Sequence, residues 1–452
     1  YEAFGQYLSG AEDNLQPLIR HKYSKPDEMF DLHSYNKGGS VLHFIRKQLG
    51  DEAFFEGLKL YLTRHAYTSV DIDALRIALE ETSGRDLQYI FTTLFEQKSY
   101  PKLKYLTNWD NGTLTVQVSQ DVYEDNMPYS LKMNLEVYTA GGKVSTFPYH
   151  ITEVENVFTF KTDKPECVIF DADFAMPGVA RREIKETKEE VLARLKYAKL
   201  GIYRYRAVEQ LAAMELEEAD YDEIGKVGLA DNFHAVRQGT LELLGAKLDS
   251  ANIEAKFGNQ IRSLVSTDKK TTVKGTALGV LAANPVLEAN KALFQKHINA
   301  RSYSMQAAAA EGLLAGAKDA EADKIIALIE AEKENPQTGQ ILASYYIKNK
   351  VAGKYGAIEK MAKKSSGGEA FRIFEQMAVY IMDQPDYVQD QAKAFFIQSC
   401  KASDFGVKLG AFRAIVFLAA EKQDENLVKI LKEVYDAETN KDIQRYMQMM
   451  MQ

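Results

Sequence analysis

The sequence predicts a mainly α-helical chain with one small β-sandwich. Apolar residues recur at helical spacing over the first hundred residues, alternate with polar residues over the next eighty, and return to helical spacing in the remainder. The length suits about three domains, and a content of 46% hydrophobic and 27% charged residues suits packed cores. We therefore expect domains at residues 1–100, 101–183 and 184–452.

The first region predicts consecutive helices. In one of them Val41, Ile45 and Leu49 lie on the same face, and Gly50 stands where a helix C-cap is expected. Another helix is expected at about residues 71–82. A core this small is incomplete alone, so we expect these helices to pack on an upstream segment.

The middle region predicts short strands. Residues 113–118 and 131–137 alternate between apolar and polar side chains. Gly141 and Gly142 then predict a hairpin turn, because both adopt positive φ without strain. Further strands are expected before residue 171, and several short strands with regular turn signals indicate a β-sandwich.

The last region contains a repeated helical pattern rich in alanine and leucine. Its anchor residues Leu211, Leu244, Leu281 and Leu314 are 33, 37 and 33 residues apart, and a later copy begins at Val407. Small residues on one face let paired helices approach closely, and stacked pairs bury a shared core. The period is slightly short for HEAT repeats, so we expect a HEAT-like α-solenoid whose surface could bind protein partners.

Composition excludes two classes of function. The net charge of −8 comes without a stripe dense in lysine and arginine, so we expect no nucleic-acid partner. The longest apolar runs fall short of the roughly 20 residues that cross a bilayer. Cys167 and Cys400 form neither a disulfide framework nor a CxxC site, which leaves the compartment open. The chain opens without an initiator Met or signal-peptide pattern, so we expect a fragment or processed product.

Tyr35 is the residue from which a chemistry can be argued. It precedes an amphipathic helix, with Ser34 as the expected N-cap, and the following Gly38 and Gly39 leave room for a substrate. A phenol at a helix start, where the field is positive, suits a group that faces a developing oxyanion. From spacing alone, however, Tyr35 is more often an ordinary half-buried aromatic, since the chain has 25 tyrosines.

The stretch from Tyr35 to Gly50 resembles the segment of zinc aminopeptidases of the aminopeptidase N family that contains the transition-state tyrosine. Asn36 departs from the Glu or Gln common in relatives. The resemblance implies that residues 1–100 are the helical second half of a thermolysin-like catalytic domain, followed by the family's β-sandwich and helical domain. It also covers residues 51–62, 67–73, 83–87 and 97–101.

By that resemblance Tyr35 is the catalytic residue that stabilises the tetrahedral oxyanion, and the substrates are peptides. The zinc ligands and the general-base Glu of the family lie upstream of the tyrosine, and no His-Glu-x-x-His occurs in this chain. Because a catalytic zinc needs three protein ligands, we interpret His21, His33 and His43 as surface or core residues. We expect a zinc metalloaminopeptidase as the full-length parent, with no zinc bound by this chain and no activity of this chain alone.

A non-catalytic, peptidase-like scaffold is the alternative. Some relatives keep this architecture without zinc chemistry, and the solenoid would then be a protein-binding surface. Tyr35 favours the enzyme, because a scaffold has no need of a phenol in a Tyr-x-Lys-Gly context.

Overall fold

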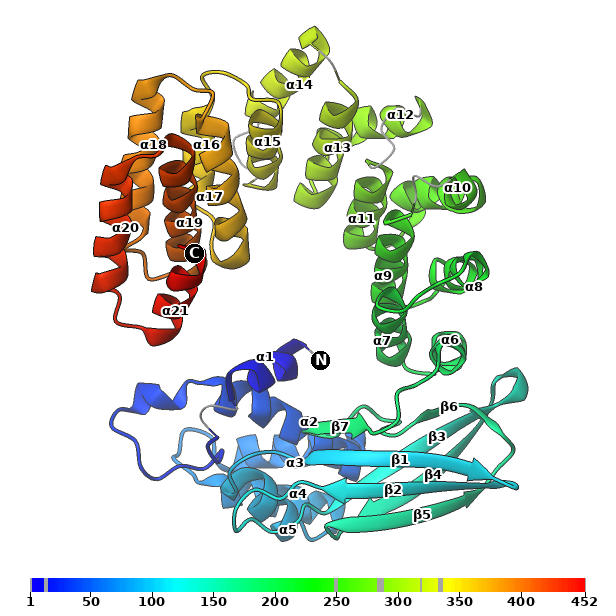
Figure 1. Ribbon diagram of the computed structural model, residues 1–452. Helices are drawn as coiled ribbons and strands as arrows, with labels where there is room; N and C mark the ends of the chain where they lie inside the picture. Colours follow the sequence, from blue (N-terminus) through cyan, green and yellow to red (C-terminus); the bar gives the residue numbers. More distant parts are fainter. Residues whose placement is uncertain are drawn as a thin grey trace. The chain divides into compact units, whose positions relative to one another are not determined.

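The structure is a computed structural model that describes residues 2–11, 15–247, 251–282, 288–317, 319–331 and 336–451. It is mainly α-helical with one small β region, which confirms the predicted fold class (Figure 1). The chain divides into two compact units, Tyr1–Val236 and Arg237–Gln452. The three domain boundaries expected from the sequence stay predictions.

The first unit opens with helices that match the sequence prediction closely. Gly50 ends one of them with a φ of 82°, a value that favours glycine. Asp71 caps another by accepting a hydrogen bond from the N–H of Asp73 at 3.2 Å. The elements are α1 (Glu2–Ala11), η1 (Pro26–Met29), η2 (His33–Lys37), α2 (Gly38–Leu49), α3 (Asp51–Arg64), α4 (Ile72–Ser83), α5 (Gln88–Phe91) and η3 (Thr92–Glu96).

Two sheets follow, as the alternating pattern predicted. One has the strand order β5-β2-β1-β7 and the other β4-β3-β6, and every pairing is antiparallel except that of β1 with β7. The strands are β1 (Lys102–Asp110), β2 (Thr113–Gln120), β3 (Leu131–Thr139), β4 (Lys143–Ile151), β5 (Glu155–Lys161), β6 (Pro165–Ile169) and β7 (Val179–Arg182). Gly141 and Gly142 turn the chain between β3 and β4 at φ of 74° and 76°, so the predicted hairpin is confirmed.

The two sheets face each other and share one core with the first helices. Val116 of β2 and Leu135 of β3 are both buried in this core, and so are Ile45 of α2 and Leu79 of α4. Between the sheets the rings of Phe147 and Phe160 lie 4.9 Å apart. The shared core therefore fixes the helix that follows Tyr35 against the sandwich.

The remainder of the first unit is helical. Thr187 begins α6 (Lys188–Tyr197) with a capping box to Glu190. Helices α7 (Gly201–Ala212), α8 (Glu218–Gly228) and α9 (His234–Gly245) follow, and α9 crosses the limit between the two units.

The second unit consists of paired helices. Helices α11, α13, α15, α17 and α19 pack consecutively, and the helices between them lie along one side of this row (Figure 1). The bounds are α10 (Ala251–Thr267), α11 (Thr271–Leu281), α12 (Glu288–His297), α13 (Tyr303–Gly316), α14 (Asp319–Ala331), α15 (Pro336–Lys348), α16 (Tyr355–Ala362), α17 (Gly367–Ile381), α18 (Asp386–Ser399), α19 (Phe405–Lys422), α20 (Glu425–Ala437) and α21 (Lys441–Met450).

The predicted anchor residues Leu211, Leu244, Leu281 and Leu314 are all buried. The assignment to HEAT-like repeats and their use as a protein-binding surface stay predictions. Across the described ranges, helices lack the combination of length and apolar character needed to traverse a bilayer.

Candidate active site around Tyr35

Tyr35 is placed by a short π-helical turn, η2, which continues directly into α2. Its side chain is 62% exposed, and its ring lies 6.2 Å from that of Phe30. Its backbone N–H donates to the carbonyl oxygen of Asp31 at 3.1 Å. Within the described part of the chain no hydrogen bond engages the Tyr35 hydroxyl, so this phenol is open to a ligand.

The turn is capped by Asp31, and the predicted cap at Ser34 is wrong. The Asp31 carboxylate accepts the backbone N–H of Ser34 at 2.9 Å and the guanidinium of Arg20 at 2.7 Å. Burial opposes ionisation of this carboxyl, but the bonds from Arg20 and Ser34 outweigh it and lower its pKa. The helical turn thus begins earlier than the sequence suggested, and Ser34 is inside it.

His33 is buried and His43 is half-buried. The Nε2 atom of His33 accepts the N–H of Gln16 at 3.2 Å, and its Nδ1 atom lies 3.3 Å from an oxygen of Asp31. Burial lowers the pKa of both histidines. The described ranges hold no group of three His, Cys, Asp or Glu side chains that could ligate a metal, so zinc does not fit these residues.

Lys37, two residues after Tyr35, is a residue whose environment the sequence did not reveal. It is 1% exposed, and its ammonium has no hydrogen-bond partner in the described part of the chain. The pKa of Lys37 is lowered to about 8, mainly by burial and to a smaller extent by the nearby positive charge of Arg20. A lysine in a Tyr-Asn-Lys-Gly sequence would ordinarily be expected at the surface.

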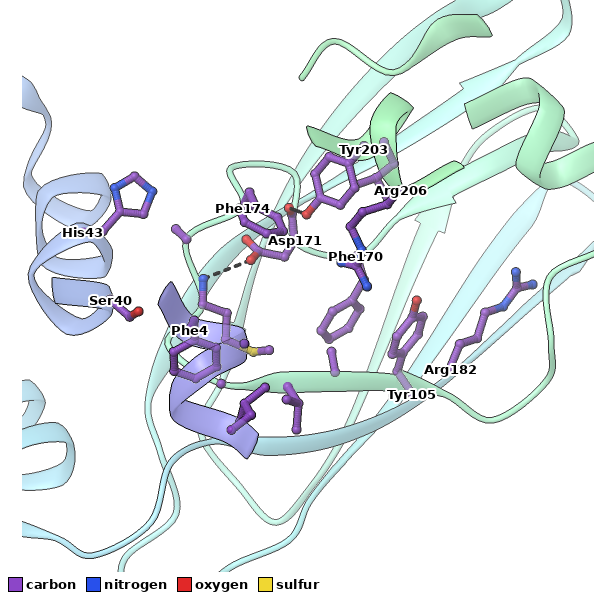
Figure 2. A pocket seen from close by; sticks show the side chains of 18 of the residues that line it. Phe4, Ser40, His43, Tyr105, Phe170, Asp171, Phe174, Arg182, Tyr203 and Arg206 are labelled. Atoms are coloured by element: carbon purple, nitrogen blue, oxygen red, sulfur yellow. Dashed lines mark hydrogen bonds between the residues drawn. The ribbon is translucent and has the colours of Figure 1, made fainter. Parts of the chain in front are cut away.

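A cavity of ≈ 1040 Å³ lies beside Tyr35. Ser40 and His43 line it from α2, and Tyr105 and Arg182 lie across from them (Figure 2). The lining comes from α1, from the segment around Tyr35, from β1, from the connection between β6 and β7, and from α6 and α7. All of these segments belong to the first unit.

Aromatic rings form one wall of this cavity. Tyr105 and Phe170 stack with ring centroids 4.2 Å apart, and Phe174 meets Tyr203 edge to face at 5.6 Å. The Tyr203 hydroxyl donates to the carbonyl oxygen of Asp171 (Figure 2). Burial raises the pKa of Tyr105 to about 12, so its phenol stays neutral.

Asp171 is the acidic group among these rings. Its carboxylate accepts the N–H of Met176 at 2.9 Å (Figure 2). Burial raises the pKa of Asp171. Hydrogen bonds from backbone N–H groups lower this pKa, but by less than burial raises it. Arg206 extends from α7 toward the same wall (Figure 2) and is exposed. One carboxyl and one guanidinium therefore lie next to this aromatic wall of the cavity.

Arg182, at the end of β7, is held in an ion pair. Its side chain is 17% exposed and pairs with Glu190 through two bonds of 2.9 and 3.0 Å. Arg194 likewise bonds to Glu186. Sequence reasoning missed these pairs, because their acidic partners belong to α6 and to the segment before it.

Comparisons with known proteins agree with the resemblance seen in the sequence. Residues 6–94 match the Peptidase family M1 domain. Aminopeptidase M1-C of Oryza sativa subsp. japonica is 24% identical over 284 residues, which is 59% of this chain and 29% of that protein. Aminopeptidase N of Escherichia coli (strain K12) is 25% identical over 268 residues, 54% of this chain and 30% of that protein. Aminopeptidase N of Lactococcus lactis subsp. lactis is 39% identical over 95 residues, 20% of this chain and 11% of that protein.

A solved structure shows the same fold. The crystal structure of Legionella pneumophila aminopeptidase A in complex with aspartic acid matches with a TM-score of 0.56 and 12% identity, over 99% of this chain and 60% of that one. The family model and the curated relatives support the assignment of the chain to the aminopeptidase N family, and the solved structure supports the fold alone. The chain spans less than a third of the length of each curated relative named above.

Proposed function

We propose that this chain is part of a zinc-dependent aminopeptidase that removes N-terminal residues from peptides, with Tyr35 as its catalytic residue. One observation supports this most strongly. Within the segment that matches the family model, Tyr35 presents an exposed phenol to the lining of a large cavity. We also propose residues 1–100 as part of the catalytic domain, 101–183 as the β-sandwich domain and 184–452 as the helical repeat domain.

The role of Tyr35 follows from the chemistry of peptide hydrolysis. Attack on the scissile carbonyl creates a tetrahedral intermediate whose oxygen gains a negative charge. A hydroxyl that donates a hydrogen bond to this oxygen stabilises a charge that is absent from the bound substrate, so it raises kcat. One such donor is worth about 3–4 kcal/mol, or about 10²–10³ in rate.

Zinc, when bound in the parent, would polarise the scissile carbonyl and lower the pKa of a bound water. The described residues of this chain do not fit a zinc ion. We therefore propose that the zinc ligands and the general base of the parent protein lie outside the described residues of this chain. What this chain contributes is the Tyr35 hydroxyl and the walls of the cavity beside it.

A Tyr35→Phe substitution in the full-length protein tests this proposal. We expect kcat for an aminoacyl p-nitroanilide to fall about 10²–10³-fold. The melting temperature should stay unchanged, because the hydroxyl makes no hydrogen bond within the described part of the chain. Tyr67→Phe is the matched control, since Tyr67 is fully exposed and outside the lining. Unchanged turnover of the Tyr35 variant would remove this residue from the mechanism and favour the non-catalytic scaffold.

A further inference from the structure

A second cavity, of ≈ 540 Å³, lies between the end of α2 and the hairpin of β3 and β4. Pockets that hold small ligands measure roughly 300–1,000 Å³. The lining comes from α2, from the connection between α4 and α5, from β3 and β4, and from the segment after β6, all within the first unit. Tyr35 is not among the lining residues, so the proposed reaction does not account for this cavity.

Two hydrogen bonds join the elements that surround this second cavity. The side-chain amide of Gln48, in the last turn of α2, donates to the carbonyl oxygen of Lys132 in β3 at 2.7 Å. The guanidinium of Arg85 donates to the carbonyl oxygen of Gln48. The end of α2 is thereby joined to the hairpin and to the connection between α4 and α5. The protein's own contacts therefore form the cavity, and one of them orients Arg85.

Basic side chains predominate among the charged residues of the lining. Lys47, Arg85 and Lys132 are exposed, and none of the three forms an ion pair within the described part of the chain. By contrast, Arg46 in the same helical turn as Lys47 pairs with Asp51 at 2.7 Å. The chain has a net charge of −8, so a hollow with several unpaired cations differs from the average of its surface.

The charge of Lys132 also acts on the neighbouring strand. Lys132 of β3 lies directly opposite His150 of β4, and both line the cavity. Burial lowers the pKa of His150, and the positive charge of Lys132 lowers it further. Like charges directly opposite each other in a sheet are destabilising. An anion bound between these strands and α2 would relieve this repulsion.

The acidic groups of the lining do not neutralise its cations. They are Asp171 and Asp173. Burial raises the pKa of Asp171 and so disfavours its charged form. Asp173 accepts a hydrogen bond from the side-chain amide of Asn134 at 2.7 Å. Even with both carboxyls ionised, the three cations outnumber them, and the lining keeps a net positive charge.

We propose that this cavity binds a phosphate dianion, free or as the monoester of a small organic molecule, between Lys47, Arg85 and Lys132. Ammonium and guanidinium groups form short, charge-assisted hydrogen bonds with phosphate oxygens. Arg85 keeps N–H donors beyond those that the carbonyl of Gln48 engages. A phosphate monoester has about 1.5–2 negative charges at pH 7, which suits three cations better than a single carboxylate would. The proposal is independent of the proposed function, because it uses none of the residues of that chemistry.

Calorimetric titration of the full-length protein with inorganic phosphate and with glycerol 3-phosphate, at constant ionic strength, tests the proposal. We expect saturable binding of both probes at this site. A tighter Kd for the ester would identify the ligand as an organic phosphate, and a tighter Kd for the inorganic ion would identify it as the free anion. Absence of saturable binding for both probes would overturn the proposal.

Substitutions assign the bound phosphate to this cavity. Lys132→Gln removes one charge, and we expect the Kd for either probe to rise about tenfold. Lys132→Arg keeps the charge and should retain binding. Lys143→Gln is the matched control, because Lys143 is an exposed lysine of the same hairpin outside the lining. Tyr35→Phe should leave the Kd unchanged, since Tyr35 is also outside the lining.

Two results with these variants would show that the proposal is wrong. If Lys132→Gln leaves the Kd unchanged, the phosphate binds elsewhere on the protein. If Lys132→Gln and Lys143→Gln raise the Kd equally, the anion responds to the overall charge of the hairpin and not to the cavity. Melting temperatures measured without phosphate show that each variant is folded, and Lys132 is suited to this because its ammonium makes no hydrogen bond in the described ranges.

Discussion

Tyr35 and Lys37 lie two residues apart on the same helical turn, yet Tyr35 is 62% exposed and Lys37 is 1% exposed. The turn therefore presents its phenol outward while it buries an ammonium. A buried charge without a partner in the described structure destabilises the fold. The Tyr-Asn-Lys-Gly segment is thus a place where stability and the arrangement of the site are linked.

We expect Lys37→Met to stabilise the chain at neutral pH by on the order of 1–3 kcal/mol. The folded pKa of Lys37 is about 8 against 10.5 in the unfolded chain, so the unfolded state binds more protons between these values. Wild-type stability should therefore gain from this group as the pH rises from about 8 to 10.5. Urea unfolding of both proteins at pH 7.5 and 9.5 checks this. A difference between variant and wild type that does not shrink with rising pH would contradict the buried, unpaired ammonium.

Gly142→Ala should destabilise the sandwich more than Gly141→Ala. Both residues have positive φ, at 76° and 74°, so either substitution costs about 1–2 kcal/mol in backbone strain. A Cβ at Gly142 would also lie 2.4 Å from the ring of Tyr197, whereas one at Gly141 meets nothing within 4 Å. The clash adds about 1–3 kcal/mol. Thermal unfolding of the two variants measures the difference, and equal melting temperatures would contradict the close approach of α6 to the hairpin.

Leu281→Ala tests the core of the paired helices. Leu281 is 0% exposed in α11, so the cavity left behind should cost about 2–5 kcal/mol. Leu328→Ala in α14 removes the same atoms from a side chain that is 41% exposed, and we expect about 0.5 kcal/mol or less. Denaturant unfolding of both variants gives the two values. A cost at Leu281 no greater than at Leu328 would argue against the repeated frame of anchor leucines.

The purified 452-residue chain should show no zinc-dependent peptidase activity. The described residues contain no three-ligand group, and the chain has no His-Glu-x-x-His. Metal analysis after dialysis against zinc should find less than one equivalent, and an aminoacyl p-nitroanilide should not be hydrolysed. Hydrolysis that a chelator abolishes would show that this prediction is wrong.

Local signals predicted much of the fold. Gly50 and the pair Gly141–Gly142 were identified because their conformations depend on the residue itself, and the structure places them as expected. Strands β1 and β7 were not predicted. β1 has no regular burial pattern, and β7 has four residues that pair in parallel with it, so both depend on contacts distant in sequence.

At the candidate site, too, local sequence predicted one part and missed another. Tyr35 could be singled out because a short motif surrounds it, although its catalytic role stays a proposal. The wall opposite could not be predicted, since Tyr105, Phe170 and Tyr203 come from three separate segments. The burial of Lys37 was equally hidden, because a lysine next to two glycines has the local pattern of a surface turn.

The core that joins α2 and α4 to both sheets has a consequence for how the first unit opens. Ile45 and Leu79 pack in the same cluster as Val116 and Leu135, so separating the helices from the sandwich would bare apolar surface on both. Fluctuations that expose the core side of the helices should also expose the core of the sandwich. We therefore expect the helices and the sandwich to unfold as a single cooperative element. An excised sandwich without the preceding helices would begin with part of its apolar surface in water.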